Sequence, residues 1–220
     1  MLNWQAIDTV LLDMDGTLLD LAYDNHFWLE HIPRAFAQKH ALALDQAKEK
    51  LYEKMSATSG TLEWYCIDHW SKTLGFDVHE HVRNTAHQSS LRPHVFEFLN
   101  FLQSRQKEVL LVTNAHQVVL ESKLTNIKIE PYFDRMVTSH QFHAPKESQE
   151  FWQRFAQAYP FNAQRTLLID DNEAVLNAAN QFGIKYLVTL KQPDSRREIK
   201  TNTQHPAIHH FEELLSPQYG

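Results

Sequence analysis

Short apolar runs rich in Val, Ile and Leu alternate along the chain with longer stretches of helical period. Five runs have the length and composition of strands, at residues 9–13, 108–113, 136–139, 166–170 and 186–190. Parallel strands need long crossover connections, which are usually helical, so this alternation predicts a parallel sheet with helices packed on it. The expected fold class is α/β, with a Rossmann-like parallel sheet as its core.

The gap between the first two runs is too long for one crossover. Residues 21–90 contain four helix-like segments, at residues 25–40, 45–57, 61–74 and 77–89, and no convincing strand. We therefore expect an inserted α-helical cap over residues 21–90, and a core built from residues 1–20 and 91–220. Residues 191–205 are polar and show little pattern, and residues 211–215 are expected to form a short closing helix.

The amino-acid composition indicates a folded globular protein. Of the 220 residues, 43% are hydrophobic and 22% are charged, which is typical of a folded globular chain. There are 21 basic and 27 acidic residues, a net charge of −6, and because no basic cluster stands out, a nucleic-acid polymer is not an expected partner. The start of the chain is not signal-like and no run of about 18 apolar residues occurs, so we expect a cytoplasmic protein without a membrane segment.

Cysteine and histidine give little sign of a metal centre. Cys66 is the single cysteine, so no internal disulfide can form. The 14 histidines are scattered, and close pairs such as His79 with His81 and His140 with His143 have no framework of cysteine or carboxylate residues beside them. We therefore expect a surface role for the histidines rather than a zinc site.

Polar residues end three of the predicted strands, and parallel sheets bind ligands at that edge. They are Asp13 with Asp15, Thr113 with Asn114, and Asp170 with Asp171, and Lys146 follows the third strand. Converging carboxylates repel one another unless a cation lies between them, and Mg²⁺ prefers such oxygen ligands. Asp13 and Asp170 can supply the carboxylates, and Asp15 can face the reacting group as a proton donor. Gly16 is expected to let the backbone approach a phosphate, with amide N–H groups pointing inward.

These motifs, in this order, resemble those of the haloacid dehalogenase-like (HAD) phosphohydrolases: Asp13-Met14-Asp15-Gly16-Thr17, Thr113-Asn114, Lys146 and Asp170-Asp171. The resemblance implies the HAD fold and Mg²⁺-dependent hydrolysis of a small phosphomonoester. It implies that Asp13 is the nucleophile that becomes an aspartyl phosphate, and that Asp15 is general acid and then general base. It also implies phosphate binding by Thr113, Asn114 and Lys146, and a metal site formed by Asp13, the Asp15 carbonyl, Asp170 and Asp171.

Some roles within this resemblance stay open. Asp15 favours phosphate chemistry over dehalogenation, because a halide leaving group needs no proton. Phosphatases and mutases share both aspartates, so the sequence does not separate these two reactions. The family often writes its last motif G-D-x-x-x-D, whereas this chain has Asp170-Asp171-Asn172-Glu173, so either Asp171 or Glu173 takes the secondary metal role.

The expected cap is rich in aromatic residues, and Trp64 and Tyr65 are candidates for stacking on a substrate base. If residues 61–74 form one helix, Trp64 shares a face with Asp68, and Tyr65 with His69. Residues 8–22, 64–66, 113–116 and 165–171 resemble the bacterial GMP/IMP nucleotidases of the superfamily, which implies purine nucleoside 5'-monophosphates as substrates. The alternatives are a phosphatase for a sugar phosphate or other small organic phosphate, and a non-catalytic module that binds a phosphate ligand. The sequence leaves the oligomeric state open, a monomer included.

Overall fold

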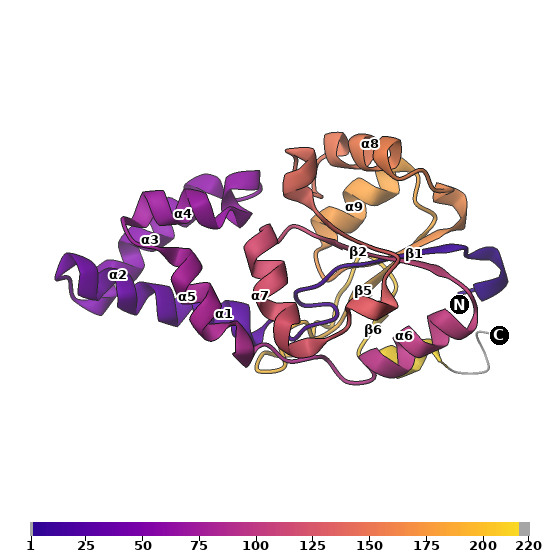
Figure 1. The fold of residues 1–220 in the computed structure, drawn as a ribbon, viewed down its shortest axis with the longest axis horizontal. Helices are drawn as coiled ribbons and strands as arrows, with labels where there is room; N and C mark the ends of the chain where they lie inside the picture. Colours follow the sequence, from indigo (N-terminus) through magenta and orange to yellow (C-terminus); the bar gives the residue numbers. More distant parts are fainter. Residues whose placement is uncertain (1, 216–220) are drawn as a thin grey trace.

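A parallel sheet lies at the centre of the computed structural model, which describes residues 2–215 (Figure 1). Within these residues the strands are β1 (Thr9–Leu12), β2 (Glu108–Thr113), β3 (Arg135–Thr138), β4 (Thr166–Ile169), β5 (Tyr186–Leu190) and β6 (Ala207–Ile208). They pair in parallel in the order β3-β2-β1-β4-β5-β6. The five predicted strands are confirmed to within one residue at each end. The sequence does not predict β6, because two residues are too few to show an alternation.

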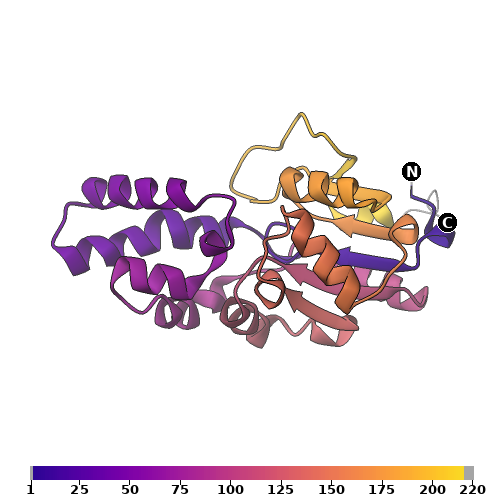
Figure 2. The ribbon, with the colours of Figure 1, turned by 90° about the horizontal axis from the view of Figure 1, so that it is seen from above.

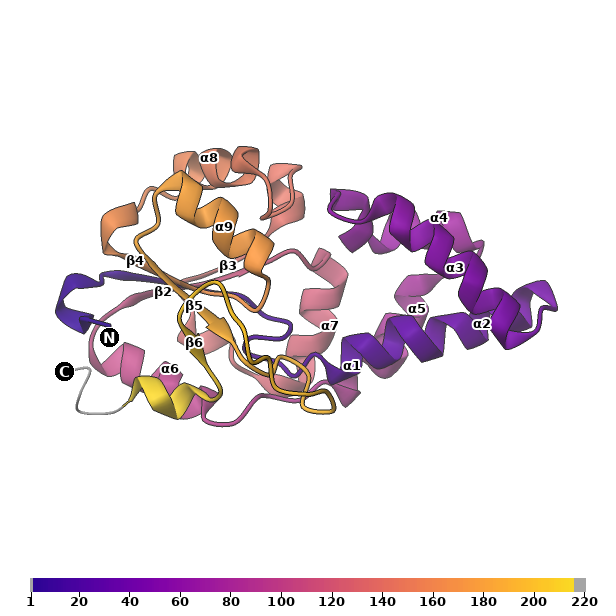
Figure 3. The same ribbon diagram turned by 180° about the vertical axis from the view of Figure 1, so that it is seen from behind.

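Helices cover both faces of this sheet (Figures 1 and 3). On one face, α6 (Val95–Ser104) and α7 (Gln117–Ile127) contribute to an apolar cluster, and α8 (Gln149–Ala158) and α9 (Glu173–Phe182) contribute to another on the opposite face. Because side chains alternate along a strand, Val10 and Leu12 belong to the first cluster and Leu11 to the second. The architecture is the expected α/β fold.

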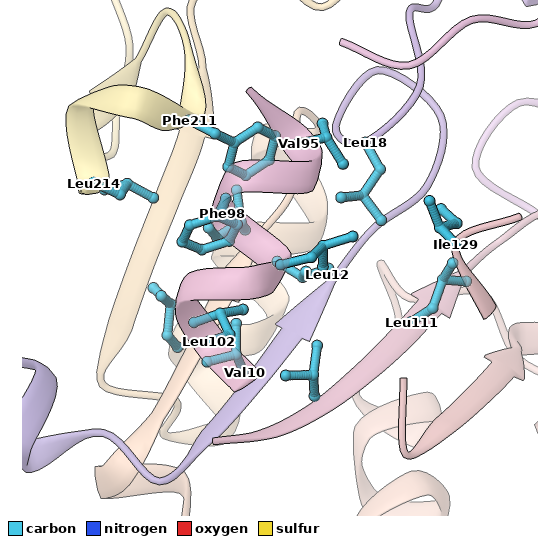
Figure 4. Close-up of a cluster of buried hydrophobic side chains, with 14 of the residues drawn as sticks. Val10, Leu12, Leu18, Val95, Phe98, Leu102, Leu111, Ile129, Phe211 and Leu214 are labelled. Carbon is cyan, nitrogen blue, oxygen red and sulfur yellow. The ribbon is translucent and has the colours of Figure 1, made fainter. Parts of the chain in front are cut away.

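Figure 4 is a close-up of part of the first cluster. Phe98 of α6 stacks on Phe211 with their ring centroids 4.8 Å apart, and both side chains are fully buried. Burying a phenylalanine side chain stabilises the fold by about 1.5–3 kcal/mol, so this contact fixes the end of the described chain against the sheet. The closing helix expected at residues 211–215 is a 3-10 helix, η8 (Phe211–Leu214).

Local signals set the ends of these elements. Asn172 caps α9, where its Oδ1 accepts from the Ala174 N–H at 2.9 Å, and Gly183 ends this helix at φ 110°. A short 3-10 helix, η1 (Trp4–Ala6), precedes β1, and others occupy connections; they are η5 (Glu130–Tyr132), η6 (Ser139–Phe142) and η7 (Ala163–Arg165).

The chain between β1 and α6 forms a group of helices beyond the carboxyl ends of the strands (Figure 2). The group contains α1 (Ala22–His26), a π-helical turn η2 (Phe27–His31), α2 (Ile32–His40), α3 (Leu44–Thr58), η3 (Leu62–Tyr65), α4 (Ile67–Leu74), α5 (Val78–Thr85) and η4 (Ala86–Gln88). Its buried apolar residues, among them Phe27, Phe36 and Trp70, form a cluster of their own. We propose that residues 21–90 are a cap on a core of residues 1–20 and 91–220.

The single helix expected over residues 61–74 is wrong. Cys66 has extended backbone angles, φ −92° and ψ 108°, and separates η3 from α4. The Trp64 carbonyl, which a continuous helix would pair with the N–H of Asp68, accepts from the indole Nε1 of Trp70 at 2.9 Å. Trp64 and Asp68 therefore do not lie on successive turns of one helix, and neither do Tyr65 and His69.

The two connections to this helical insert run side by side. The Asp20 N–H donates to the Ser90 carbonyl at 2.9 Å, and the Arg92 N–H donates to the Leu18 carbonyl at 2.9 Å. The chain thus enters and leaves the insert at one place, close to the end of β1.

Among residues 2–215, no helix combines the length and the apolar character that crossing a membrane requires.

Candidate active site

The sheet brings the predicted site residues of three strands to one edge. β1 lies between β2 and β4, and Leu12 is level with Leu111 on one side and with Ile169 on the other. The ladder continues one residue further, because the Asp13 N–H donates to the Ile169 carbonyl at 3.0 Å. Asp13 and Asp170 therefore occupy neighbouring strand ends, at the edge nearest the helical insert.

Lys146 contacts these strand ends from the segment before α8. Its buried Nζ donates to Asp13 Oδ1 at 2.5 Å, to Asp170 Oδ2 at 2.7 Å and to the Val112 carbonyl at 2.9 Å. One carboxylate oxygen from each of Asp13, Asp170 and Asp171 lies within 4.8 Å of the other two. Three carboxylates around one ammonium leave an excess of negative charge, and a divalent cation would balance it.

The pKa values of the cluster reflect this excess. Burial raises the pKa of Asp13 well above its usual range, although Lys146 opposes the effect. Burial and the charge of Asp170 raise the pKa of Asp171 to about 7. Burial lowers the pKa of Lys146, but Asp13 and Asp170 raise it by more, so the ammonium stays charged. A cation bound among the carboxylates would keep them ionised.

Asp171 and Glu173, the two candidates for the secondary metal role, have different surroundings. Asp171 belongs to it, whereas Glu173 Oε1 accepts from the Gln204 N–H at 3.1 Å and its Oε2 lies 3.7 Å from His205 Nε2. The oxygen-only donor set of Asp13, Asp170 and Asp171 suits a hard divalent metal ion. The carboxylate of Asp15 is not part of this set, and the expected approach of its carbonyl to the metal stays a prediction.

Thr113 and Asn114 end β2 beside Lys146. Thr113 Oγ1 accepts from the Ala115 N–H at 3.0 Å, which leaves its own hydroxyl hydrogen for another acceptor. The side chain of Asn114 is used at both ends, since Oδ1 accepts from the Lys146 N–H and Nδ2 donates to Glu147, each at 2.9 Å. One Asn114 N–H remains for a phosphate, so this residue also fixes the position of Lys146.

Gly16 lies in the turn that follows Asp15. Its N–H donates to the Leu19 carbonyl at 2.8 Å and therefore does not point at a ligand. A side chain approaches Gly16 closely, because a Cβ on Gly16 would lie 2.6 Å from Cγ of Asp171. At φ 85°, glycine is also the residue that the turn favours. Gly16 thus makes room for the carboxylate of Asp171.

Asp15 is held by a lysine that the sequence analysis did not single out. Lys123 of α7 is completely buried, and its Nζ donates to Asp15 Oδ1 at 2.7 Å and to Asp24 Oδ1 at 2.6 Å. Asp24 lies on α1, at the start of the insert. Burial and the charge of Asp15 raise the pKa of Asp24 to about 7. One ammonium therefore connects the proposed acid with the first helix of the insert.

Glu147 is a second residue that was missed, and it joins the insert to the sheet. Its Oε1 accepts from the Tyr65 hydroxyl at 2.6 Å and from Asn172 Nδ2 at 3.1 Å, and its Oε2 accepts from Asn114 Nδ2. Burial and Glu147 raise the pKa of Tyr65, which keeps the phenol protonated as a donor. The hydroxyl of Tyr65 is therefore engaged with the core.

A cavity of about 570 Å³ lies between the insert and the sheet edge. The carboxylate cluster and Lys146 line its floor, and the insert supplies an apolar wall that includes Trp28, Trp64 and Trp70. This volume is within the range of small-molecule sites, and a few polar groups opposite an apolar wall are typical of them. The predicted residues Trp64 and Tyr65 both line this cavity.

Comparisons with known proteins agree with this arrangement. The chain is 40% identical over 212 residues to the GMP/IMP nucleotidase YrfG of Escherichia coli (strain K12), and equally to that of Shigella flexneri, with 96% of each chain covered. A HAD phosphatase from Thermococcus onnurineus has the same fold, with a TM-score of 0.78 at 18% identity over 94% of this chain and 96% of that one. The family model for haloacid dehalogenase-like hydrolases matches residues 10–189. The chain therefore belongs to the haloacid dehalogenase-like hydrolase family and is a hydrolase.

Proposed function

We propose that this enzyme hydrolyses purine nucleoside 5'-monophosphates, GMP and IMP, and that it does so with Mg²⁺ through a phosphorylated Asp13. One observation carries the proposal: a single cavity joins the carboxylate cluster and Lys146 to a wall of indole rings. The floor has the charges that a phosphate and a metal ion need, and the wall offers flat surfaces for a base. The 40% identity to a GMP/IMP nucleotidase supports the choice of substrate.

In the first proposed step, a carboxylate oxygen of Asp13 attacks phosphorus and the bond to the nucleoside oxygen breaks. Asp15 gives its proton to that oxygen, so the nucleoside leaves as an alcohol. Lys146 balances charge on Asp13 and the phosphoryl group, while Thr113 and the remaining N–H of Asn114 donate to phosphate oxygens. Asp13, Asp170, Asp171 and the Asp15 carbonyl would hold Mg²⁺, which supplies positive charge to the phosphoryl oxygens.

In the second step, water attacks the phosphorus of the aspartyl phosphate. Asp15, now a carboxylate, takes a proton from that water, and the carboxylate of Asp13 leaves. Inorganic phosphate is released and both aspartates regain their starting forms. Release of free phosphate also distinguishes a phosphatase from a mutase, which would transfer the phosphoryl group to another substrate hydroxyl.

The test is phosphate release from GMP, IMP, AMP, a pyrimidine monophosphate and several sugar phosphates, each with Mg²⁺ and with excess chelator. We expect metal-dependent release that is fastest with GMP and IMP. Release from sugar phosphates alone would overturn the substrate assignment while leaving the role of Asp13 intact. Phosphate binding without turnover of any substrate would indicate a non-catalytic binding module instead.

The role of Trp64 has its own test. Trp64→Ala should lower kcat/KM for GMP by about 5- to 160-fold, because stacking of a base on an aromatic ring contributes about 1–3 kcal/mol. Trp64→Phe keeps a ring and is the matched control, and a minimal aryl phosphate is the control substrate. Equal losses on GMP and on the aryl phosphate would show that Trp64 only packs against Trp70, with which it makes an edge-on contact at 6.5 Å.

A further inference from the structure

A cluster of soft and borderline metal ligands lies beside the cavity and has no part in the proposed hydrolysis. Cys66, His116 and His140 each offer one ligand atom, and these three atoms lie within 4.8 Å of one another. They come from three separate segments: Cys66 from the break between η3 and α4, His116 from the N-cap of α7, and His140 from η6. Their distance apart in sequence explains why no ligand spacing was visible there.

The sheet explains how the two histidines meet. β2 and β3 are neighbours, and their last residues, Thr113 and Thr138, are paired. His116 and His140 follow these residues after short connections, and their ring centroids are 5.0 Å apart. The insert contributes Cys66, whose extended backbone separates η3 from α4.

One ring nitrogen of His140 lacks a hydrogen-bond partner within the described part of the chain. Its Nε2 is buried, and no group among residues 2–215 hydrogen-bonds to it. Leaving a buried polar atom without a partner is unfavourable, and most such atoms in folded proteins are satisfied by protein, water or an ion. Burial also lowers the pKa of both His116 and His140, which favours the neutral imidazole that binds metals.

Neighbouring groups resemble the supports that metal-binding histidines have. Asp68 Oδ2 lies 3.6 Å from His116 Nε2, and Asp68 Oδ1 lies 2.6 Å from His79 Nε2. Carboxylates in this position commonly orient a histidine ligand and increase its basicity. The chain offers one thiolate and two imidazoles here, a set that suits Zn²⁺ and not Mg²⁺.

We propose that Cys66, His116 and His140 form a second metal site, which takes a dication of the zinc type and ties the helical insert to the sheet. A tetrahedral zinc ion holds its ligand atoms about 3.5 Å apart, so small rotations of the three side chains complete the site. Water can take the fourth position. The metal would fix Cys66, and with it the adjacent Tyr65, against the core.

The test uses Co²⁺ as a spectroscopic substitute for Zn²⁺. Cobalt bound to a thiolate gives a sulfur-to-metal charge-transfer band in the near ultraviolet, and Cys66 is the only cysteine in the chain, so any such band reports this site. We expect one equivalent of Co²⁺ to produce the band in the full-length protein, and one equivalent of Zn²⁺ to remove it. Because the measurement does not depend on phosphate release, it tests the metal site independently of the proposed activity.

Three variants complete the experiment. Cys66→Ser should abolish the band, and His140→Gln, which keeps the thiol, should weaken Co²⁺ binding at least about tenfold. Asp13→Asn, which disables the carboxylate cluster, should leave the band unchanged. Absence of a band in the wild-type protein would overturn the proposal, and so would unchanged affinity in a folded His140→Gln variant. If that variant does not fold, His116→Gln makes the same comparison.

Discussion

Replacing Lys123 by methionine removes a buried charge while keeping a side chain of similar length. Loss of one partner from a buried ion pair costs about 3–5 kcal/mol. Lys123 contacts two carboxylates, whose side chains are 19% and 20% exposed, so both would lose their partner. Asp24 can take up a proton near neutral pH, because burial and Asp15 raise its pKa to about 7. The free energy of unfolding should therefore fall by about 3 kcal/mol, near the lower end of this range. This corresponds to a decrease of roughly 6–12 °C in Tm.

The effect on catalysis follows from the position of Asp15. Without Lys123 its carboxyl group is no longer held at 2.7 Å, and an acid that is out of place cannot protonate the leaving oxygen. We expect kcat for GMP to fall about 10²-fold, since general acids contribute about 10²–10⁴. An aryl phosphate with an acidic leaving group needs little protonation, so its kcat should fall less than about tenfold.

The assay is steady-state kinetics on both substrates, together with thermal unfolding. Lys123→Arg is the matched control, because it keeps a cation between Asp15 and Asp24 and should recover part of the stability and of the activity on GMP. Equal losses on the two substrates would refute the link between Lys123 and the acid. Unchanged stability in Lys123→Met would refute the buried ion pair itself.

Three further predictions test other parts of the site. Asp13→Asn should abolish phosphate release while circular dichroism shows an intact fold; substantial remaining activity would exclude Asp13 as the nucleophile. Gly16→Ala should destabilise the protein by about 1–3 kcal/mol, because the new Cβ meets Asp171 and the backbone is in the left-handed region; a Tm equal to that of the wild type would contradict this. When chelator removes the metal, burial and the charge of Asp170 raise the pKa of Asp171 to about 7, which is above its value in the unfolded chain. Protonation of Asp171 then stabilises the folded state, and this stabilisation is lost as the pH rises from about 4 to about 7. The increase in Tm caused by Mg²⁺ should consequently grow over this range in thermal scans, and a constant increase would rule out Asp171 as a titrating member of the cluster.

The sequence predicts the sheet well because its strands are continuous apolar runs that end in polar residues. That rule finds Asp13, Thr113 and Asp170 and misses Lys123, which does not lie at a strand end. A signal for Lys123 was available: it falls between Leu120 and Leu124 on the apolar face of α7, where all three side chains are buried and a charge needs a partner.

Other features depend on contacts that no local pattern contains. The break at Cys66 coincides with a hydrogen bond from the Trp70 indole to the Trp64 carbonyl, and a hydrophobic period over residues 61–74 does not reveal it. Glu147 lies next to Lys146 in sequence, but its partners Tyr65 and Asn172 become neighbours only when the insert folds over the sheet. The sequence therefore predicts the polar residues at the sheet edge more readily than the residues of the insert that line the cavity.

The paired connections to the insert have a consequence for how such a fold can change. Leu18 is hydrogen-bonded to Arg92, and Asp20 to Ser90, so the ends of the inserted segment are already together whatever lies between them. The entropy of closing a loop grows only with the logarithm of its length, and doubling the length costs about 0.6 kcal/mol. A longer or shorter insert could therefore replace this one at little cost to the sheet. Substrate choice can then diverge while the residues that cleave the phosphate ester stay in place.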